Sequence, residues 1–258
     1  MQLNPNLIFD IGMHKGEDTK FYLKNGYSVV AVEANPVLAR ECEAKFKSEI
    51  ESGRLTIVNV GIAEEEGEMP FYVNKHSSEW SSFDREIGTR NNTPFEIINI
   101  KTVRTKSLFE KYGCPYYLKV DIEGFDYLAI KDIQESLVRP QYVSCESNEV
   151  EWLDILHQKG YRKFKLINQA NNFRPLNTSL EGKNWYINYR RVKHSFKDKM
   201  KNILPSRYVG GSSGPFGEET KGEWKSYEEV RKSYLTYKNG KSGKPLNNIS
   251  WCDFHASL

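Results

Sequence analysis

The sequence predicts an α/β protein built on a doubly wound, mostly parallel sheet. An apolar run at residues 7–11 breaks into an Asp-x-Gly-x-x-x-Gly turn, and a β-branched run at 29–32 follows after a helix-length interval and ends in an acid. A third apolar run, at 116–120, again leads into acids and a glycine. The first two runs form a strand-turn-helix-strand unit, which is typical of the nucleoside-binding half of such a sheet.

The first turn has the residue types that a nucleoside site requires. Gly12 tolerates backbone angles that other residues avoid and lets the main chain approach a ligand, while Gly16 lets a helix begin against the strand. Glu33, at the end of the second strand, can accept hydrogen bonds from both ribose hydroxyls. Neither Gly-x-Gly-x-x-Gly nor Gly-x-x-x-x-Gly-Lys-Ser/Thr occurs, so a nucleoside without phosphates fits better. We therefore expect S-adenosylmethionine; a glycine turn without a ligand is the alternative for this unit alone.

Composition narrows the class of protein. With 258 residues, 38% of them hydrophobic, the chain can bury one large core, or one core plus an appended region. The net charge of +3 is too small to indicate a nucleic-acid partner. Four scattered cysteines without a Cys-x-x-Cys pair favour neither a disulfide framework nor a zinc site. Because there is no signal-like segment and no apolar run of about 18 residues, we expect a cytoplasmic protein without a transmembrane segment.

The first half of the chain continues with alternating elements. Asn25-Gly26 suits the end of the first helix, and Asn35-Pro36 suits the start of a second, whose apolar face is Leu38, Cys42, Phe46 and Ile50. Residues 55–60 predict a third strand, with Gly61 at its carboxyl end, where an adenine ring would lie. Residues 64–73 suggest a hairpin around Gly67. The polar span 74–92 is either a mobile loop over the strand ends or a plain surface loop.

The strand at 116–120 ends in two acids, Asp121 and Glu123. Desolvating carboxylates is costly unless they are paired or bound, so a ligand explains this pair better than packing does. Residues 142–148 predict a fifth strand, and Glu146 lies either in the same cleft or in a solvated turn. A helix from about residue 149 to Gly160 follows. Strands at 161–168 and 185–189 would form the terminal hairpin of the sheet.

The composition changes near residue 190, and we predict a domain boundary there. Residues 1–190 would form the cofactor-binding catalytic domain and 191–258 a C-terminal extension that caps the acceptor site. Residues 190–207 predict a basic amphipathic helix, either docked on its own domain or in contact with a membrane or substrate phosphates. The glycine-rich stretch within 208–224 is either a linker or a lid hinge. A helix at 226–237 and an extended segment at 251–256, which places Asp253 and His255 on one side, complete the chain.

Three motifs resemble the FkbM family of S-adenosylmethionine-dependent methyltransferases over about residues 5–190. They are Phe9-Asp10-Ile11-Gly12 through Gly16, Val32-Glu33-Ala34-Asn35-Pro36 and Leu118-Lys119-Val120-Asp121-Ile122-Glu123-Gly124. The resemblance implies a class I, Rossmann-like fold with a seven-stranded, mostly parallel sheet that has one antiparallel strand. It also implies O-methylation, often of sugar hydroxyls. The cofactor-binding residues expected here are Asp10, Gly12, Gly16, Glu33, Ala34, Gly61, Asp121 and Glu123.

An alcohol acceptor needs help to lose its proton, and the sequence leaves two routes open. One is a general base, for which His14 and His255 are the candidates beside Asp121; either histidine could instead have a structural role. The other is a divalent metal ion that binds the hydroxyl. Oxygen and imidazole ligands for such an ion would come from Asp121, Glu146, Asp253 and His255. No compact ligand motif decides between the two routes.

The leading functional hypothesis is an O-methyltransferase of a carbohydrate hydroxyl, with a nucleotide-activated sugar or a capsule or other polysaccharide precursor as the acceptor. The basic helix would meet the phosphates. One alternative is a nucleic-acid methyltransferase that uses 190–207 as a phosphate-binding face, although no Asn-Pro-Pro-Tyr-type amine site is present. Another is a nucleoside-binding module without catalysis, against which the intact Gly12, Gly16 and Glu33 count.

Overall fold

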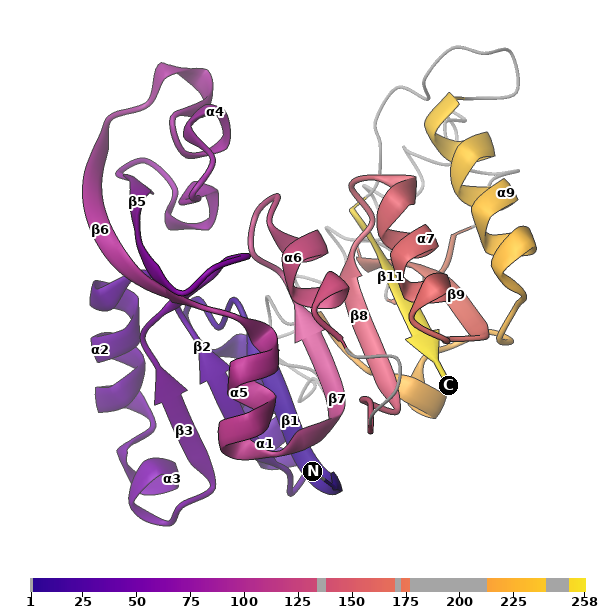
Figure 1. Ribbon diagram of the computed structural model, residues 1–258, viewed down its shortest axis with the longest axis horizontal. Coiled ribbons are helices and arrows are strands. Elements are labelled where there is room, and N and C mark those ends of the chain that lie inside the picture. Colours follow the sequence, from indigo (N-terminus) through magenta and orange to yellow (C-terminus); the bar gives the residue numbers. More distant parts are fainter. Residues whose placement is uncertain (1, 134–137, 170–172, 177–212, 240–250) are drawn as a thin grey trace, which may run out of the picture.

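Among the described residues, eight strands form a sheet at the centre of the molecule (Figure 1). The computed structural model describes residues 2–133, 138–169, 173–176, 213–239 and 251–258. In spatial order the strands are β10 (Arg174–Pro175), β9 (Lys163–Asn168), β11 (Cys252–Ser257), β8 (Tyr142–Glu146), β7 (Cys114–Val120), β1 (Leu3–Ile11), β2 (Ser28–Val32) and β3 (Leu55–Val58).

The strand directions confirm the predicted class I fold. β3, β2, β1, β7 and β8 are parallel, while β11 runs antiparallel to both of its neighbours, β8 and β9. The strand order reverses direction along the chain at β1, and such a switch point is where ligands bind in open α/β sheets. β10, a strand of two residues, adds an eighth member to the seven that were predicted.

The antiparallel strand comes from the end of the chain, and this corrects the predicted domain boundary. β11 lies inside the sheet, with Asp253 in register with Glu146 and His255 in register with Ser144. The last residues therefore belong to the main sheet and not to an appended extension. The predicted strand at 185–189 and the predicted basic helix at 190–207 lie outside the described residues.

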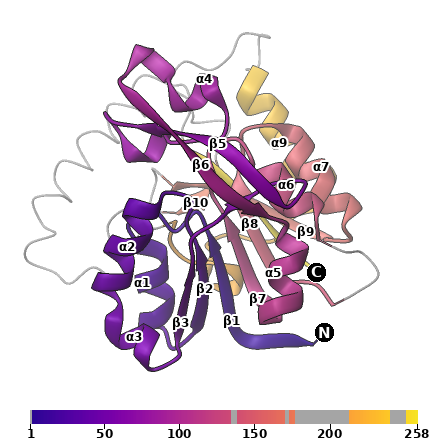
Figure 2. The same cartoon turned by 60° about the vertical axis from the view of Figure 1, so that its left-hand side comes forward.

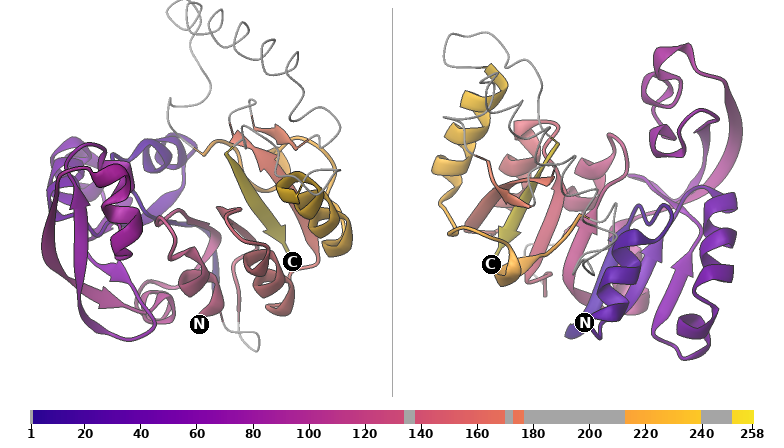
Figure 3. Two further views of the ribbon diagram at one scale, coloured as in Figure 1. Left: turned by 90° about the horizontal axis from the view of Figure 1, so that it is seen from above. Right: turned by 180° about the vertical axis from the view of Figure 1, so that it is seen from behind.

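Helices cover both faces of the sheet. One apolar core contains residues of α5 (Thr105–Tyr112), α6 (Asp126–Lys131), α7 (Val150–Gln158) and α9 (Tyr227–Asn239). The core on the opposite face contains residues of α1 (Glu17–Lys24) and α2 (Pro36–Lys45), which are seen from behind in Figure 3. Next to α1 on that face, Phe216 stacks on Tyr117 with 4.1 Å between ring centroids. The segment after residue 212 thus covers this part of the sheet, as a helix would.

Local sequence explains how the first helices begin and end. α1 closes at Asn25, and Gly26 follows with φ +90°, a left-handed angle that favours glycine. Asn35 caps α2 by accepting a hydrogen bond from the N–H of Val37 at 3.0 Å. The apolar face predicted for residues 38–50 does pack inward, although the helix breaks at Phe46 and continues as the short α3 (Lys47–Glu51).

A second sheet, to which the described part of the chain contributes three strands, lies above the carboxyl ends of the main sheet (Figure 2). It consists of β4 (Gly61–Ile62), β6 (Phe95–Val103) and β5 (Gly67–Asn74), with η1 (Ser78–Trp80), α4 (Arg85–Gly88) and η2 (Arg90–Asn92) between β5 and β6. We call residues 61–103 the cap. The hairpin predicted around Gly67 is wrong, because Gly67 begins β5 and pairs with Thr102 of β6. The other described element is η4 (Gly217–Glu219).

No helix in the described part of the chain has both the length and the apolar character needed to cross a membrane.

Candidate functional site

A cavity of about 370 Å³ lies between the carboxyl ends of the parallel strands and the cap. Eight of the residues singled out from the sequence line it: Gly12, His14, Glu33, Ala34, Gly61, Asp121, Glu123 and Glu146. Four others do not, namely Asp10, Gly16, Asp253 and His255. The cap contributes a wall that includes Ser78, Trp80 and Phe83, and Trp251 borders the cavity just before β11. The predicted polar loop therefore does lie over the strand ends.

Gly12 shapes the turn that follows β1. The N–H groups of Gly12 and Met13 both donate to the carbonyl of Val32, at 3.0 and 2.9 Å, so the turn folds onto the end of β2. Gly12 has φ +87°, and a Cβ at this position would lie 1.8 Å from the backbone oxygen of Asp121. The turn therefore requires glycine for its conformation and for the close passage of β7.

Glu33 is held by backbone N–H groups on both sides. Its Oε2 accepts from the N–H of His14 and its Oε1 from the N–H of Asn35, both at 2.8 Å. The side chain is buried, and burial raises its pKa to about 7 against the opposing effect of these hydrogen bonds. Each carboxylate oxygen keeps a second lone pair, so a pair of vicinal hydroxyls can still donate to it.

An apolar wall adjoins Glu33 where β3 leads into the cap. Val60, Ile62 and Phe71 line it together with the ring of Phe83. Gly61 leaves room for this ring, because a Cβ on Gly61 would lie 2.2 Å from the Phe83 Cζ atom. A flat, apolar base can bind against such a wall beside a ribose held by Glu33.

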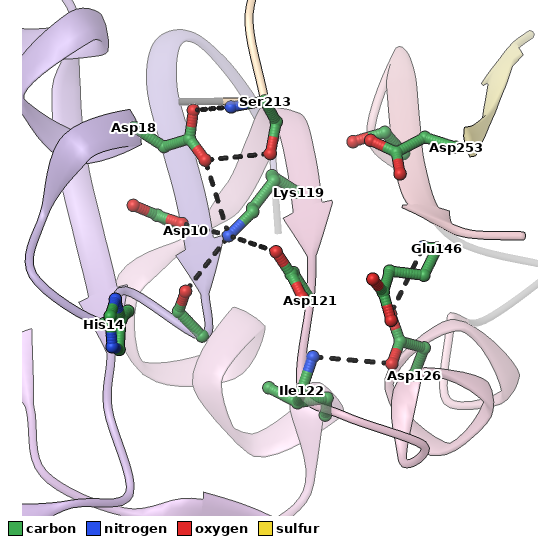
Figure 4. A network of polar contacts seen from close by, with 12 residues as sticks. Asp10, His14, Asp18, Lys119, Asp121, Ile122, Asp126, Glu146, Ser213 and Asp253 are labelled. Carbon is green, nitrogen blue, oxygen red and sulfur yellow. Dashed lines mark hydrogen bonds and ion pairs between the residues drawn. The ribbon is translucent and has the colours of Figure 1, made fainter. Parts of the chain in front are cut away.

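Lys119 lies at the centre of a buried charge cluster beside the glycine turn (Figure 4). Its Nζ donates to the carbonyl of Gly12 at 3.0 Å and lies 3.3 Å from Asp10, 3.6 Å from Asp18 and 3.6 Å from Asp121. Burial alone would lower the pKa of Lys119, but the three carboxylates raise it well above its usual value. One ammonium thus faces three carboxylates, and this wall of the cavity favours a cationic ligand.

Asp10 stabilises the glycine turn through buried polar contacts. It is fully buried, its Oδ2 accepts a hydrogen bond from Thr19 Oγ1 at 2.6 Å, and its Oδ1 faces Lys119. Gly16 has φ +76° at the start of α1 and packs against the Phe46 ring. These two expected cofactor residues shape the turn rather than line the cavity.

A comparison of the chain with known protein families identifies the family to which it belongs. The profile described as "Methyltransferase FkbM domain" matches residues 10–163, which include the glycine turn, Glu33, the cap and the end of β7. The chain belongs to the FkbM methyltransferase family. The resemblance carried by its three motifs is confirmed, and its reaction class is methyl transfer from S-adenosylmethionine. A search among curated proteins found no significant match.

Solved methyltransferases are distant from this FkbM chain. A precorrin-6y C5,15-methyltransferase from Geobacter metallireducens is 10% identical, with a TM-score of 0.36, over 68% of this chain and 74% of its own. Phosphoethanolamine N-methyltransferase 2 from Haemonchus contortus is 10% identical, with a TM-score of 0.41, over 100% of this chain and 49% of its own. A TehB-like methyltransferase from Corynebacterium glutamicum is 8% identical, with a TM-score of 0.36, over 67% and 75%. Similarity at this level does not indicate a shared function.

The cavity of the FkbM domain fits S-adenosylmethionine. Glu33 retains lone pairs for the ribose, and the apolar wall at Phe83 suits the adenine. The positive sulfonium and ammonium groups suit the side of Lys119 on which Asp18 and Asp121 outnumber the single cation. Burial raises the pKa of Asp18 to about 7, so a bound cation would also favour its ionised form.

The far side of the cavity, over the ends of β7 and β8, is acidic. Glu123 has φ +47° and is paired with Arg90 of the cap. Glu146 lies beside it, with burial and the nearby Asp121 raising its pKa to about 8. Asp126 lies at the start of α6, and burial and Asp121 raise its pKa to about 7. Both acids predicted at the end of β7, Asp121 and Glu123, therefore border the cavity.

His255 is not placed for catalysis, because β11 carries it into the sheet. It is 3% exposed, in register with Ser144 and Lys165, and burial lowers its pKa to about 3. It lies two residues further from the cavity edge than Asp253, whose carboxylate accepts a hydrogen bond from Gln169. The prediction that His255 is a general base is wrong on this geometry.

The four predicted metal ligands do not form a site either, although Asp121 and Glu146 both line the cavity. Within the described residues, no group of three or more His, Cys, Asp or Glu side chains is arranged to hold a metal ion. His14, the other histidine candidate, does line the cavity. Its ring Nε2 forms a hydrogen bond with Ser78 Oγ at 2.8 Å, and its backbone N–H donates to Glu33. Burial lowers the pKa of the imidazole. His14 thus joins the cofactor turn to the cap.

Lys119 is the functional residue that sequence reasoning missed. It lies within one of the motifs, yet no role was predicted for it. The available signal was a lysine inside a buried strand of a chain whose neighbouring motifs are acidic. A buried ammonium group requires such acidic partners. Two of its three carboxylate partners, Asp10 of β1 and Asp18 of α1, come from about 100 positions earlier, and its contact with Gly12 spans 107 residues.

Proposed function

We propose that the protein transfers the methyl group of S-adenosylmethionine to a hydroxyl of a carbohydrate. The observation that carries this proposal is the composition of the cavity beyond Asp121, where the lining includes the carboxylates of Glu123 and Glu146 and the indole rings of Trp80 and Trp251. Carboxylates accept hydrogen bonds from hydroxyls, and aromatic rings pack on the apolar faces of sugar rings. Both features suit a polyhydroxylated acceptor.

The cofactor would supply an activated methyl group on a positive sulfur when bound. Glu33 would hold its ribose, the wall at Phe83 its base, and the Asp18 and Asp121 side its positive groups. Lys119 keeps Asp121 and the Gly12 carbonyl in fixed positions, because one ammonium contacts both. The protein's remaining tasks are to align the hydroxyl and remove its proton.

The charge of the cavity constrains how a nucleotide-linked sugar would bind. In the described lining, the acids Glu17, Asp18, Glu33, Glu79, Asp121, Glu123 and Glu146 outnumber Lys119 and His14. Phosphates would be repelled here, so the sugar would enter and the phosphates would lie outside. The basic residues 190–207, which lie outside the described residues, remain the proposed contact for them. A polysaccharide precursor and a cytoplasmic location are part of the same proposal.

Two measurements test this function. The first is calorimetric titration of S-adenosylmethionine and S-adenosylhomocysteine into the wild-type protein and into Glu33→Ala. We expect Glu33→Ala to weaken binding by roughly tenfold or more, since it removes the acceptor of charge-assisted hydrogen bonds. No binding to protein freed of carried-over cofactor would contradict the cofactor assignment.

The second measurement is methyl transfer to a panel of nucleotide sugars, free sugars and glycans, with and without Mg²⁺ or Mn²⁺. Methylation of at least one sugar hydroxyl is expected. A protein that binds the cofactor but methylates no member of the panel would contradict the carbohydrate acceptor. A dependence on the added ion would restore the metal route that the side-chain arrangement does not itself support.

A further inference from the structure

Three acids that follow β7 and β8 line the acceptor side of the cavity, and in the described part of the chain Glu146 is the one of them without a cationic partner. Asp121 lies 3.6 Å from Lys119, and Glu123 is paired with Arg90. Glu146 also lines the cavity, but among the described residues no basic side chain forms an ion pair with it. Its partners are neutral donors: Trp251 Nε1 donates to Oε1 at 2.8 Å and Asn148 Nδ2 to Oε2 at 3.0 Å.

These contacts fix the Glu146 carboxylate without using its proton-accepting capacity. Each oxygen accepts one hydrogen bond and keeps a further lone pair. The donors come from both sides, Trp251 before β11 and Asn148 after β8, so the carboxylate is held at the cavity edge. Figure 4 shows Glu146 across from Asp121, on the side away from His14.

We propose that Glu146 is the general base of the reaction and accepts the proton of the acceptor hydroxyl. The inference rests on the proposed function, because it needs a hydroxyl acceptor. The acceptor oxygen forms a bond to the methyl carbon while the carbon–sulfur bond breaks, and that electron pair leaves on sulfur. The oxygen–hydrogen bond breaks, its electron pair stays on oxygen, and the proton goes to a Glu146 oxygen. The proton then passes to water, which restores the carboxylate.

The groups around Glu146 suit this role. The titratable neighbours that act on it most strongly within the described residues are acidic: Asp121 and Glu123 follow β7, Asp126 begins α6, and Asp253 lies on β11. Burial and these charges raise the pKa of Glu146 to about 8, against the hydrogen bond from Asn148. A base with a pKa near the working pH is the most effective, because it is partly ionised and still basic. An exposed glutamate would be a much weaker base.

The two histidines predicted as bases are less well placed. His255 lies inside the sheet, and His14 is engaged with Ser78 and Glu33 on the cofactor side. Glu146 is the group that the geometry places over β8, where the cavity extends past Asp121.

The kinetic test uses Glu146→Gln, Glu146→Asp and the control Glu149→Gln, with the first sugar of the panel that the wild-type protein methylates. Glu149 is exposed, three residues further along, and does not line the cavity. We expect Glu146→Gln to lower kcat by roughly 100-fold or more while the Kd of S-adenosylmethionine changes less than about threefold. Glu146→Asp should retain part of the rate, and Glu149→Gln should match the wild type.

The pH profile separates a base from a structural residue. Wild-type kcat/KM should rise with an inflection near the raised pKa, and the residual rate of Glu146→Gln should lose this inflection. Trp251→Phe removes a donor to the carboxylate and should move the inflection upward. Glu146→Gln turnover within threefold of the wild type at every pH would overturn the proposal.

A titration gives a readout that does not depend on turnover. Protein labelled with ¹³C at the glutamate carboxyl is titrated in complex with S-adenosylhomocysteine, and the resonance missing from Glu146→Gln is assigned to Glu146. A midpoint between about pH 7 and 9 supports the proposal, and a midpoint near the ordinary value of about 4.3 overturns it. If the wild-type protein binds cofactor but methylates no sugar, the proposed acceptor class fails, and this titration alone decides on Glu146.

Discussion

Ser213 joins the C-terminal part of the chain to Asp18, at the start of α1. Its N–H and its Oγ donate to the two carboxylate oxygens of Asp18 at 2.7 and 2.9 Å, although 195 positions separate the residues. Asp18 lies in turn 3.6 Å from the Nζ of Lys119. One buried carboxylate therefore connects the segment after residue 212 to the lysine that holds the cofactor turn.

Ser213→Ala tests this connection. The variant keeps the N–H but removes the Oγ donor, so a buried carboxylate loses one of its hydrogen bonds. We expect a loss of about 1–2 kcal/mol in the free energy of unfolding, measured by urea denaturation at pH 7. Ser233→Ala is the control, because its Oγ donates to the backbone oxygen of Glu229 on an exposed part of α9. Equal losses in the two variants would mean that the Asp18 contact contributes nothing specific.

The sequence predicted the first βαβ unit well because its signals are local. A glycine with a left-handed angle, a cap at Asn35 and an acid at the end of β2 each depend on a few adjacent residues. The same holds for Asp121 and Glu123, whose position follows from the end of a single buried strand. Local signals therefore located eight of the residues that line the cavity, while the apolar wall, Lys119 and the side chains of the cap were not predicted.

Contacts between distant segments were not predictable in the same way. β11 joins the sheet 84 positions after its partner Asn168, as the Gln169 to Asp253 hydrogen bond also spans 84 residues. The alternating pattern of a short strand does not indicate which strands will be its neighbours in the sheet. β5 was assigned a wrong partner for the same reason, since no element was predicted at 95–103, where β6 forms. His255 was misplaced because the extended segment predicted at 251–256 was not assigned to the sheet, where it forms β11.

Lys119→Met should destabilise the protein in a pH-dependent manner. The variant leaves Asp10, Asp18 and Asp121 without their cation, and breaking a buried ion pair costs roughly 3–5 kcal/mol. The carboxylates then bind protons more tightly in the folded state, so the deficit should be larger at pH 8 than at pH 5.5. Urea unfolding at both values of pH measures it.

Lys165→Met is the matched control, because Lys165 is buried to the same 3% exposure in a strand of the same sheet. Its Nζ donates to the carbonyl and the hydroxyl of Thr220, not to carboxylates. We expect a deficit that changes little between the two values of pH. A Lys119→Met deficit that is equally independent of pH would contradict the charge cluster.

The stability of the cofactor-free protein should fall as the pH rises from 5.5 to 8. Burial raises the pKa of Asp18, Glu33 and Asp126 to about 7 and that of Glu146 to about 8. The folded state then holds protons that the unfolded chain has released, so this stabilisation is complete below about pH 4 and disappears as the pH passes these raised values. Each group contributes roughly 1 kcal/mol or more.

Urea unfolding of the wild type, Glu146→Gln and Glu149→Gln across this range measures the effect. Glu146→Gln should show a shallower decline, since its amide does not titrate, while Glu149→Gln should follow the wild type. A stability that stays constant or rises toward pH 8 would contradict the raised pKa values of these buried acids.

Arg90 fastens the cap to the acidic side of the cavity, and its removal should loosen the cap. Its guanidinium pairs with Glu123, and its Cζ lies 5.2 Å from the centroid of the Trp80 ring, while Ser82 Oγ also donates to the Glu123 carbonyl at 2.9 Å. Arg90→Met should therefore speed amide hydrogen exchange at residues 78–92 by roughly tenfold or more, because a charge-assisted hydrogen bond is lost. Arg85→Met, an exposed position on α4, is the control. If both variants exchange like the wild type, the β5–β6 ladder alone holds the cap over the cavity, and the Arg90 pair with Glu123 serves only to neutralise that acid.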